Sequence, residues 1–145
     1  MEPRAKTRRL LDRLVAAARR TGADAATVCR QLPILHSCVP KDDEPVLLAR
    51  ATRPGDRATY LLLLTARRLV VTRETRVLRR QHLHLNADPR HLSDVIWTPE
   101  PTMGAIALSA TAVDGVREHF WIRTAAVEAS AAALHGVFGR QPAFV

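Results

Sequence analysis

The sequence predicts an α+β fold, in which an N-terminal helical segment precedes a curved antiparallel β-sheet of about seven strands that is closed by a C-terminal helix. Apolar residues recur at helical spacing near both ends of the chain. Between these ends, short apolar runs alternate with turn residues, as strands do. The runs follow one another with short connections, which favours antiparallel pairing. With 145 residues and 47% hydrophobic content, the chain can build one core.

Two helices are expected before the strands. The first covers Arg4–Arg20, with an aliphatic stripe on one face and arginines on the other, and Gly22 suits the left-handed cap that ends it. The second starts at Asp24, a good N-cap, and runs to Leu32, because Pro33 cannot continue a helix.

A proline-punctuated polar linker over 33–45 follows, and it gives the only internal boundary. We therefore expect an N-terminal helical extension and linker at 1–44 and the main domain at 45–145. The predicted strands are Val46–Thr52, Ala58–Thr65, Arg68–Thr72, Val77–Leu85, Leu92–Thr98, Ala105–Val113 and Val116–Arg123. Asp114-Gly115 between the last two is a strong hairpin signal, because both residues tolerate positive φ.

Two further patterns complete the prediction. In the fourth strand, alternation places Leu83 and Leu85 on one face and His82 and His84 on the other. The tail Thr124–Gly139 is expected to be the capping helix, since its apolar residues recur at helical spacing.

One segment of the chain is similar to a known family. Leu61–Val71, reading LLLLTARRLVV, resembles the second-to-third strand hairpin of bacterial pleckstrin-homology-like and GRAM-like domains. Leu92–Ile96 looks like the Asp-plus-β-branched signature at the start of that family's fifth strand. The resemblance covers about 44–138, and departs from the family at Ala66, where the turn usually has Asp or Asn. It implies a seven-stranded barrel capped by a helix and a binding scaffold. Some members of the family bind phosphoinositide headgroups, others bind peptides, and many bacterial members have no clear ligand.

The charge balance favours acidic partners. Lysine and arginine number 22 against 14 acidic residues, for a net charge of +8, and nearly all of the basic residues are arginines. Arginine suits bidentate capture of phosphate or carboxylate. The alternative is an arginine- and alanine-rich coding bias, as in a bacterial high-GC genome. In either case the positive charge attracts acidic molecules.

The best candidate site is a group of arginines at the open end of the expected barrel. In the pleckstrin-homology-like fold, the first-to-second and third-to-fourth strand loops lie beside each other there. These loops supply Arg53, Arg57, Arg73, Arg76 and Arg79. Their mutual repulsion would be relieved by an acidic protein segment or an anionic membrane surface. The alternative is a solvated basic rim that Asp56 and Glu74 partly neutralise.

The first helix is a second candidate. Its aliphatic stripe consists of Leu10, Leu11, Leu14 and Val15, which could lie on an anionic membrane surface or dock into a partner's groove. The favoured interpretation is that this stripe packs on the chain's own sheet, or on a second copy in a homodimer. The two helices also resemble a helix-turn-helix in outline, with Arg30 and Gln31 as base-reading candidates. Nucleic-acid binding is therefore the alternative function, disfavoured by an aromatic content of 4%.

Other chemistry finds little support in the sequence. His82 and His84, joined by His91 and His119, could bind a metal, but surface histidines on a strand are far commoner, so we expect no metal and no cofactor. The sequence has no GxSxG and no Gly-rich phosphate loop, so we expect a non-enzymatic protein. Two cysteines without CxxC spacing and an N-terminus unlike a signal peptide indicate a cytoplasmic location, either free or peripheral at the membrane.

Overall fold

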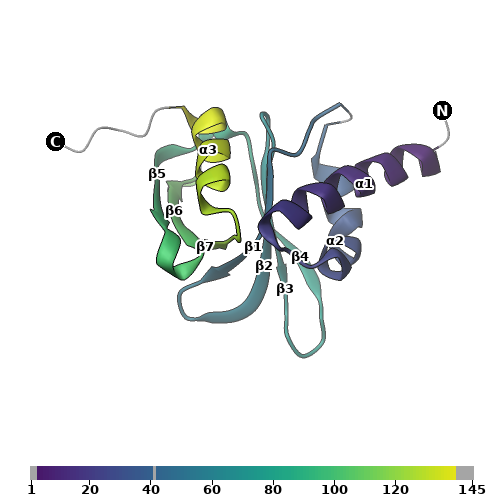
Figure 1. Cartoon of the computed structure of the whole chain (residues 1–145), viewed down its shortest axis with the longest axis horizontal. Coiled ribbons are helices and arrows are strands. Elements are labelled where there is room, and N and C mark those ends of the chain that lie inside the picture. The colour runs from purple at the N-terminus through teal and green to yellow at the C-terminus, as the bar shows by residue number, and fades with distance from the viewer. Residues whose placement is uncertain (1–2, 41, 140–145) are drawn as a thin grey trace.

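Two helices, seven strands and a third helix follow one another along the chain (Figure 1). The computed structural model describes residues 3–40 and 42–139. The helices are α1 (Pro3–Thr21), α2 (Ala25–Cys38) and α3 (Val127–Phe138). The strands are β1 (Leu47–Arg53), β2 (Asp56–Leu64), β3 (Leu69–Glu74), β4 (Gln81–Ala87), β5 (Ser93–Glu100), β6 (Ala105–Thr111) and β7 (Arg117–Arg123). Single 3₁₀ turns, η1 (Pro89–His91) and η2 (Pro101–Met103), flank β5.

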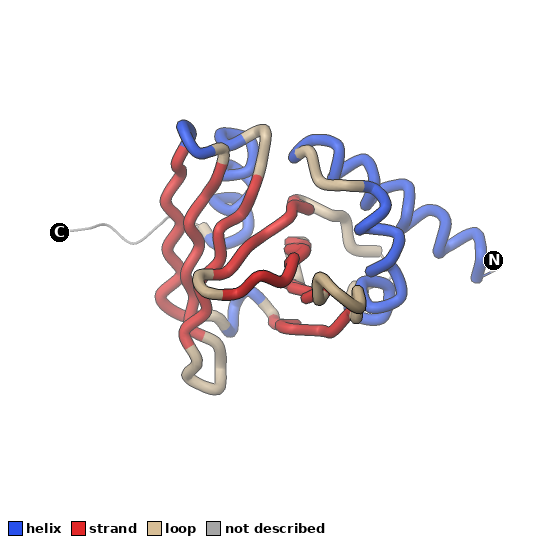
Figure 2. The backbone as a smooth tube through the Cα atoms, turned by 90° about the horizontal axis from the view of Figure 1, so that it is seen from below, coloured by secondary structure: helices blue, strands red, loops and turns tan. Residues whose placement is uncertain are grey.

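All seven strands form one antiparallel sheet in the order β4-β3-β2-β1-β7-β6-β5. The predicted α+β fold, with its seven antiparallel strands and C-terminal helix, is confirmed. The predicted barrel does not close, however, because β4 and β5 are the two ends of this order and are not hydrogen-bonded neighbours. Figure 2 shows the strands curling around an interior, with α1 and α2 on one side of the molecule. The sheet is thus an open, curled layer.

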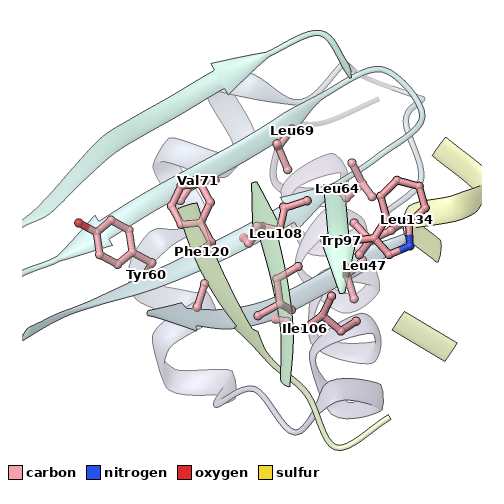
Figure 3. Close-up of a cluster of buried hydrophobic side chains, with 14 of the residues drawn as sticks. Leu47, Tyr60, Leu64, Leu69, Val71, Trp97, Ile106, Leu108, Phe120 and Leu134 are labelled. Atoms are coloured by element: carbon pink, nitrogen blue, oxygen red, sulfur yellow. The ribbon is translucent and has the colours of Figure 1, made fainter. Parts of the chain in front are cut away.

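The interior of the curl holds the main core. Alternate residues of β1, β2 and β3 point into it and meet Trp97 of β5, together with Ile106 and Phe120 from β6 and β7. Leu134 of α3 is fully buried in the same cluster (Figure 3). Tyr60 lies at the other end of the cluster from Leu134 (Figure 3). Helix α3 therefore plugs one end of the curl and leaves the end beside Tyr60 open.

A second core lies on the outer face of the sheet, under α1 and α2. Leu14 of α1 and Leu35 of α2 pack there against Leu48, Leu61 and similar residues of β1–β3. This explains why four consecutive leucines of β2 are all buried, although a strand with one solvated face would alternate. Adjacent leucines point to opposite faces of the strand, so two of the four are buried in the main core and the other two in the second core.

Helix α2 is longer than predicted. Pro33 lies inside it, and the helix continues to Cys38. A proline in a helix interior removes the hydrogen bond to the carbonyl four residues earlier, here that of Cys29. Both Pro33 and Cys29 are exposed, so water can solvate the freed carbonyl. Leu35, just beyond the proline, is fully buried in the second core, and this burial outweighs the lost bond.

Strand β4 also differs from the prediction. Val71 is opposite Leu85 and Thr72 is opposite Leu83, so His84 is an extra residue in a β-bulge. The bulge breaks the expected alternation: Leu83 is 48% exposed, while His84 is half-buried against the interior. His82 is exposed, so the two histidines do not share a face as the alternation predicted.

Three turns lie at the open end. The end of β1 is beside the start of β2, the end of β3 is beside the same part of β2, and β7 starts at that end of β1. The β1–β2, β3–β4 and β6–β7 turns are therefore neighbours at one rim. The first two form the lower edge of the molecule in Figure 1.

Candidate functional site

The β3–β4 hairpin carries an apolar tip surrounded by arginines. Val77 is 91% exposed and Leu78 is 66% exposed. The exposed residues next to them are Arg76, Arg79 and Arg80. We call these five residues the hairpin tip. Thr75 closes the turn, because its backbone N–H donates to the carbonyl of Arg80 at 3.0 Å and its hydroxyl accepts from the Arg80 N–H at 3.0 Å.

A cleft of about 490 Å³ lies beside the tip, between the start of β2 and the end of β3. Arg57, Arg73 and Arg76 line it together with Asp56, Ala58, Thr75 and Val77. Arg73 is committed to Asp56, with Nε 3.2 Å from the Oδ2 atom of that carboxylate. Arg57 and Arg76 have no ion pair within residues 3–40 and 42–139, so they are the arginines of this cleft that can take an anion.

Arg53 points into the mouth of the curl, away from the cleft. Its guanidinium lies 3.3 Å from the Glu118 carboxylate of β7 and 2.6 Å from Nε2 of His84 in β4. It also lies over the rings of Tyr60 and Phe120, at 5.9 and 5.5 Å from their centroids. Arg53 therefore links three strands across the open end and is neutralised by Glu118.

His84 is placed between two groups that compete for one of its nitrogens. Its Nε2 lies 2.6 Å from Arg53 Nη1 and 3.1 Å from Glu118 Oε2. A neutral ring nitrogen either accepts a hydrogen bond or donates one, so Nε2 can bond to only one of these groups at a time. His84 thus links β4 either to β1 through Arg53 or to β7 through Glu118, two strands that no backbone ladder joins to β4.

Asp56 is held ionised at the same rim. The Tyr60 hydroxyl, the Ala58 N–H and the Arg73 guanidinium all donate to its carboxylate, and these bonds hold the pKa of Asp56 well below its usual range. Burial, followed by the bond to Asp56, raises the pKa of Tyr60. Asp56 is therefore a permanent anion that fixes Arg73 and Tyr60.

The five predicted arginines do not converge on one point. Arg53 and Arg73 are paired with carboxylates, whereas Arg57 and Arg76 line the cleft and Arg79 lies in the turn with a left-handed φ of 48°. Sequence reasoning missed Glu118 and Tyr60, which hold Arg53 and Asp56 in place. The apolar pair Val77-Leu78 was assigned to a strand, and its position between arginines is the signal that could have identified an exposed tip.

The candidates of the N-terminal helices are engaged within the chain. Leu10 and Leu14 are buried and Leu11 and Val15 are partly buried against the chain's own sheet. Gln31 is 1% exposed. Arg30 donates from Nε and Nη2 to the two carboxylate oxygens of Glu74, at 2.8 and 3.0 Å. Neither base-reading candidate is free to reach a nucleic acid in this arrangement.

Two of the histidines considered as metal ligands are hydrogen-bonded to other side chains. His84 bonds to Arg53 or Glu118, and His119 Nδ1 lies 2.9 Å from the Ser109 hydroxyl. Across the described ranges 3–40 and 42–139, no three His, Cys, Asp or Glu side chains form a group that could hold a metal ion. In the same ranges, no helix has the length and apolar character needed to cross a bilayer.

Comparison with known proteins does not assign this chain to a family. No protein-family model and no curated protein matches the chain. A solved structure that it resembles is the C-terminal domain of an unknown protein from Leishmania infantum, with 11% sequence identity and a TM-score of 0.45. That match covers 79% of this chain and 97% of the Leishmania chain.

Proposed function

We propose that this chain is a non-catalytic binding module that docks on an anionic lipid surface through the open end of its curled sheet. The observation that carries the proposal is the hairpin tip, in which Val77 and Leu78 are 91% and 66% exposed between arginines. Apolar side chains at a protruding tip are costly in water, and they gain free energy when they enter the interface of a bilayer. The arginines beside them would then lie at the level of acidic headgroups.

A second turn reinforces this arrangement. The β6–β7 turn at the same rim exposes Val113 at 80% and Val116 at 50%. Two apolar turns at one rim suit a flat surface better than a narrow groove. Each exposed arginine near an anionic leaflet adds about 1 kcal/mol, so the arginines of the hairpin tip add electrostatic attraction to the apolar contribution of the two turns.

An acidic protein segment is the other partner that the charge allows. It would use Arg57 and Arg76 in the cleft, where the Asp56 carboxylate would repel an acidic segment and already occupies Arg73. That site would not need Val77 or Leu78 to be apolar. The exposed apolar tip therefore favours the lipid surface.

The resemblance to bacterial pleckstrin-homology-like domains supports a binding role. Seven strands that follow one another along the chain, with a helix after the last, are the pattern on which this resemblance rests. Fold alone does not choose a ligand, so the proposal rests on the tip. A peripheral site on the cytoplasmic leaflet also agrees with the free thiols of Cys29 and Cys38.

Co-sedimentation with vesicles tests the proposal. We expect the wild-type chain to bind vesicles that contain phosphatidylglycerol or cardiolipin, and not vesicles of phosphatidylcholine alone. Replacing the tip residues in Val77→Ser/Leu78→Ser should reduce binding at least about tenfold, because two buried aliphatic side chains are worth a few kcal/mol. The matched control is Met103→Ser, which removes a side chain that is 53% exposed near the far end of the sheet and should change nothing.

The charge component has its own variant. Arg76→Gln/Arg79→Gln should weaken binding and flatten its dependence on salt, because exposed charges are screened. Equal binding by wild type and V77S/L78S, or equal loss in the Met103 control, would refute docking through the tip. Binding of an acidic peptide without any binding of vesicles would assign the open end to a protein partner instead.

A further inference from the structure

A different pair of arginines lies on the outer face of the sheet. Arg50 of β1 and Arg123 of β7 are directly opposite each other in the antiparallel ladder. Residues opposite each other in such a ladder have Cβ atoms about 5 Å apart and point to the same face. Two guanidinium-bearing side chains therefore leave the sheet side by side.

Neither arginine has an acidic partner in the described residues. No ion pair within 3–40 and 42–139 includes Arg50 or Arg123, whereas Arg30, Arg53 and Arg73 each pair with a carboxylate. Arg123 lies over the ring of Trp121, 5.9 Å from its centroid. Like charges opposite each other destabilise a sheet, so this pair costs stability unless an anion joins it.

Both side chains line one cleft of about 270 Å³. The other lining residues are Thr21, Gly22, Ala23, Asp24, Thr124 and Ala125, from the α1–α2 turn and the β7–α3 connection. The volume is below the range of about 300–1,000 Å³ that is typical for drug-sized ligands, so a small polar group fits better than a large molecule.

The wall opposite the arginines is fixed in place. The Ala125 N–H donates to the Thr21 carbonyl at 2.8 Å, and the Thr21 hydroxyl donates to the Leu48 carbonyl at 2.6 Å. Gly22 has a left-handed φ of 84°, and a Cβ added to it would lie 3.7 Å from the Cβ of Ala125. The cleft is therefore formed by contacts between distant segments.

Asp24 is the acidic residue of this lining. Its carboxylate caps α2, because it accepts from the Ala26 N–H at 3.2 Å and from the Thr27 hydroxyl at 3.3 Å. The lining thus carries two positive charges and one negative charge, and the negative charge is already bonded to the start of α2. The net charge of the cleft is therefore positive.

We propose that this cleft binds a phosphate monoester group, with Arg50 and Arg123 as its two ligands. A phosphate presents several acceptor oxygens and close to two negative charges, which matches two arginine forks better than a single carboxylate does. The group can belong to a small phosphorylated molecule or to a phosphorylated side chain of a protein, and both sources offer the same chemistry. The site lies away from the hairpin tip and is independent of membrane docking.

Amide chemical shifts of the isotopically labelled full chain test this site. The probes are inorganic phosphate, O-phosphoserine and a short phosphoserine peptide, each against chloride at equal ionic strength. We expect saturable shifts at Gly22, Thr124 and Ala125. Arg50→Gln/Arg123→Gln should weaken this binding at least about tenfold, since the loss of one charge-assisted hydrogen bond already corresponds to that factor.

The control variant removes the same charge elsewhere. Arg19→Gln/Arg67→Gln replaces two exposed arginines outside the cleft and should leave the affinity unchanged. Tighter binding of the peptide than of O-phosphoserine would indicate a protein source, and equal binding would indicate a small molecule. Shifts that do not saturate, that spread over all arginine-rich segments or that weaken equally in both variants would overturn the proposal.

Thermal unfolding supplies a second readout. In chloride, R50Q/R123Q should unfold no earlier than wild type, because the substitutions remove a repulsion. Phosphate also stabilises folded proteins without binding to them, so it should raise the midpoint of wild type and of the control variant by more than that of R50Q/R123Q. A lower midpoint for R50Q/R123Q in chloride would show that the two arginines stabilise the sheet without an anion and would contradict the argument.

Discussion

The ion pair between Arg30 and Glu74 ties the helical layer to the sheet, and its two halves are expected to differ in their contribution to stability. The guanidinium of α2 donates two hydrogen bonds to the carboxylate of β3, at 2.8 and 3.0 Å. The Glu74 side chain is 7% exposed, while that of Arg30 is 29% exposed. Loss of either partner therefore leaves the other in a different environment.

The structure sets the size of each effect. Arg30→Ala leaves a nearly buried carboxylate whose remaining side-chain donor is the Gln81 amide, at 3.0 Å. We expect a loss of about 2 kcal/mol in the free energy of unfolding, at the lower end of the range for a charged group left unpaired, since Arg30 itself reaches water. Glu74→Gln keeps an acceptor oxygen and lets the guanidinium hydrate, so its cost should be about 1 kcal/mol.

The effect should depend on pH in a definite direction. The hydrogen bonds from Arg30 are the main reason that the pKa of Glu74 lies below its usual value. A carboxyl whose pKa is lower in the folded state stabilises the fold above its unfolded pKa, about 4.3, and loses this contribution as the pH falls through the folded-state pKa. The gap between wild type and R30A should therefore be widest near neutral pH and should narrow below about pH 4.

Urea unfolding followed by circular dichroism, repeated at several pH values, measures this gap. Arg90→Ala is the control, because the pair of Arg90 with Asp88 has an arginine side chain that is 85% exposed and should matter far less. The reasoning fails if E74Q destabilises more than R30A, or if the deficit of R30A is the same in acid as at neutral pH.

Two further expectations concern the cores and the rim. Leu62→Ala and Leu63→Ala should each lower the free energy of unfolding by about 3 kcal/mol, measured in urea, because the two leucines are fully buried in different cores. A loss below about 1 kcal/mol for either variant would mean that one face of β2 is not covered. Asp56→Asn should lower the pKa of Tyr60, the one tyrosine of the chain, while burial still holds it above about 10. Ultraviolet absorbance of that tyrosine against pH measures the shift, and an unchanged midpoint would show that Asp56 does not influence the hydroxyl.

Local sequence signals predicted the elements because the core is built from local runs. The predicted last strand, Val116–Arg123, differs from β7 by one residue at its start. The start of β4 was predicted wrongly, as the end of α2 was: Val77 and Leu78 are β-formers by type, yet they lie in the turn before β4. Apolar residues alone cannot distinguish a strand from an exposed tip, because the distinction depends on which neighbours cover them.

The partners of the charged residues could not be predicted in the same way. Arg30 and Glu74 are 44 positions apart in the chain, and their contact requires α2 to pack across β3. His84 reached the interior through a bulge, which no alternation pattern contains. The leucine run of β2 did carry a usable signal, since a continuous apolar strand needs cover on both faces, and only the N-terminal helices were available to provide it.

The structure also separates two roles within the arginine surplus that composition alone leaves mixed. Arg30 and Arg53 each bind a carboxylate on another element, and they join α2 to β3 and β1 to β7. Such pairs hold the fold together and need no ligand. Arg50 and Arg123 instead lie opposite each other with no carboxylate partner among the described residues, and a coding bias towards arginine gives no reason for two of them to share one cleft. An unrelieved repulsion at a fixed place in the sheet is a stronger sign of a ligand than the net charge of the chain, because it has a position and a sign that a single pair of substitutions can test.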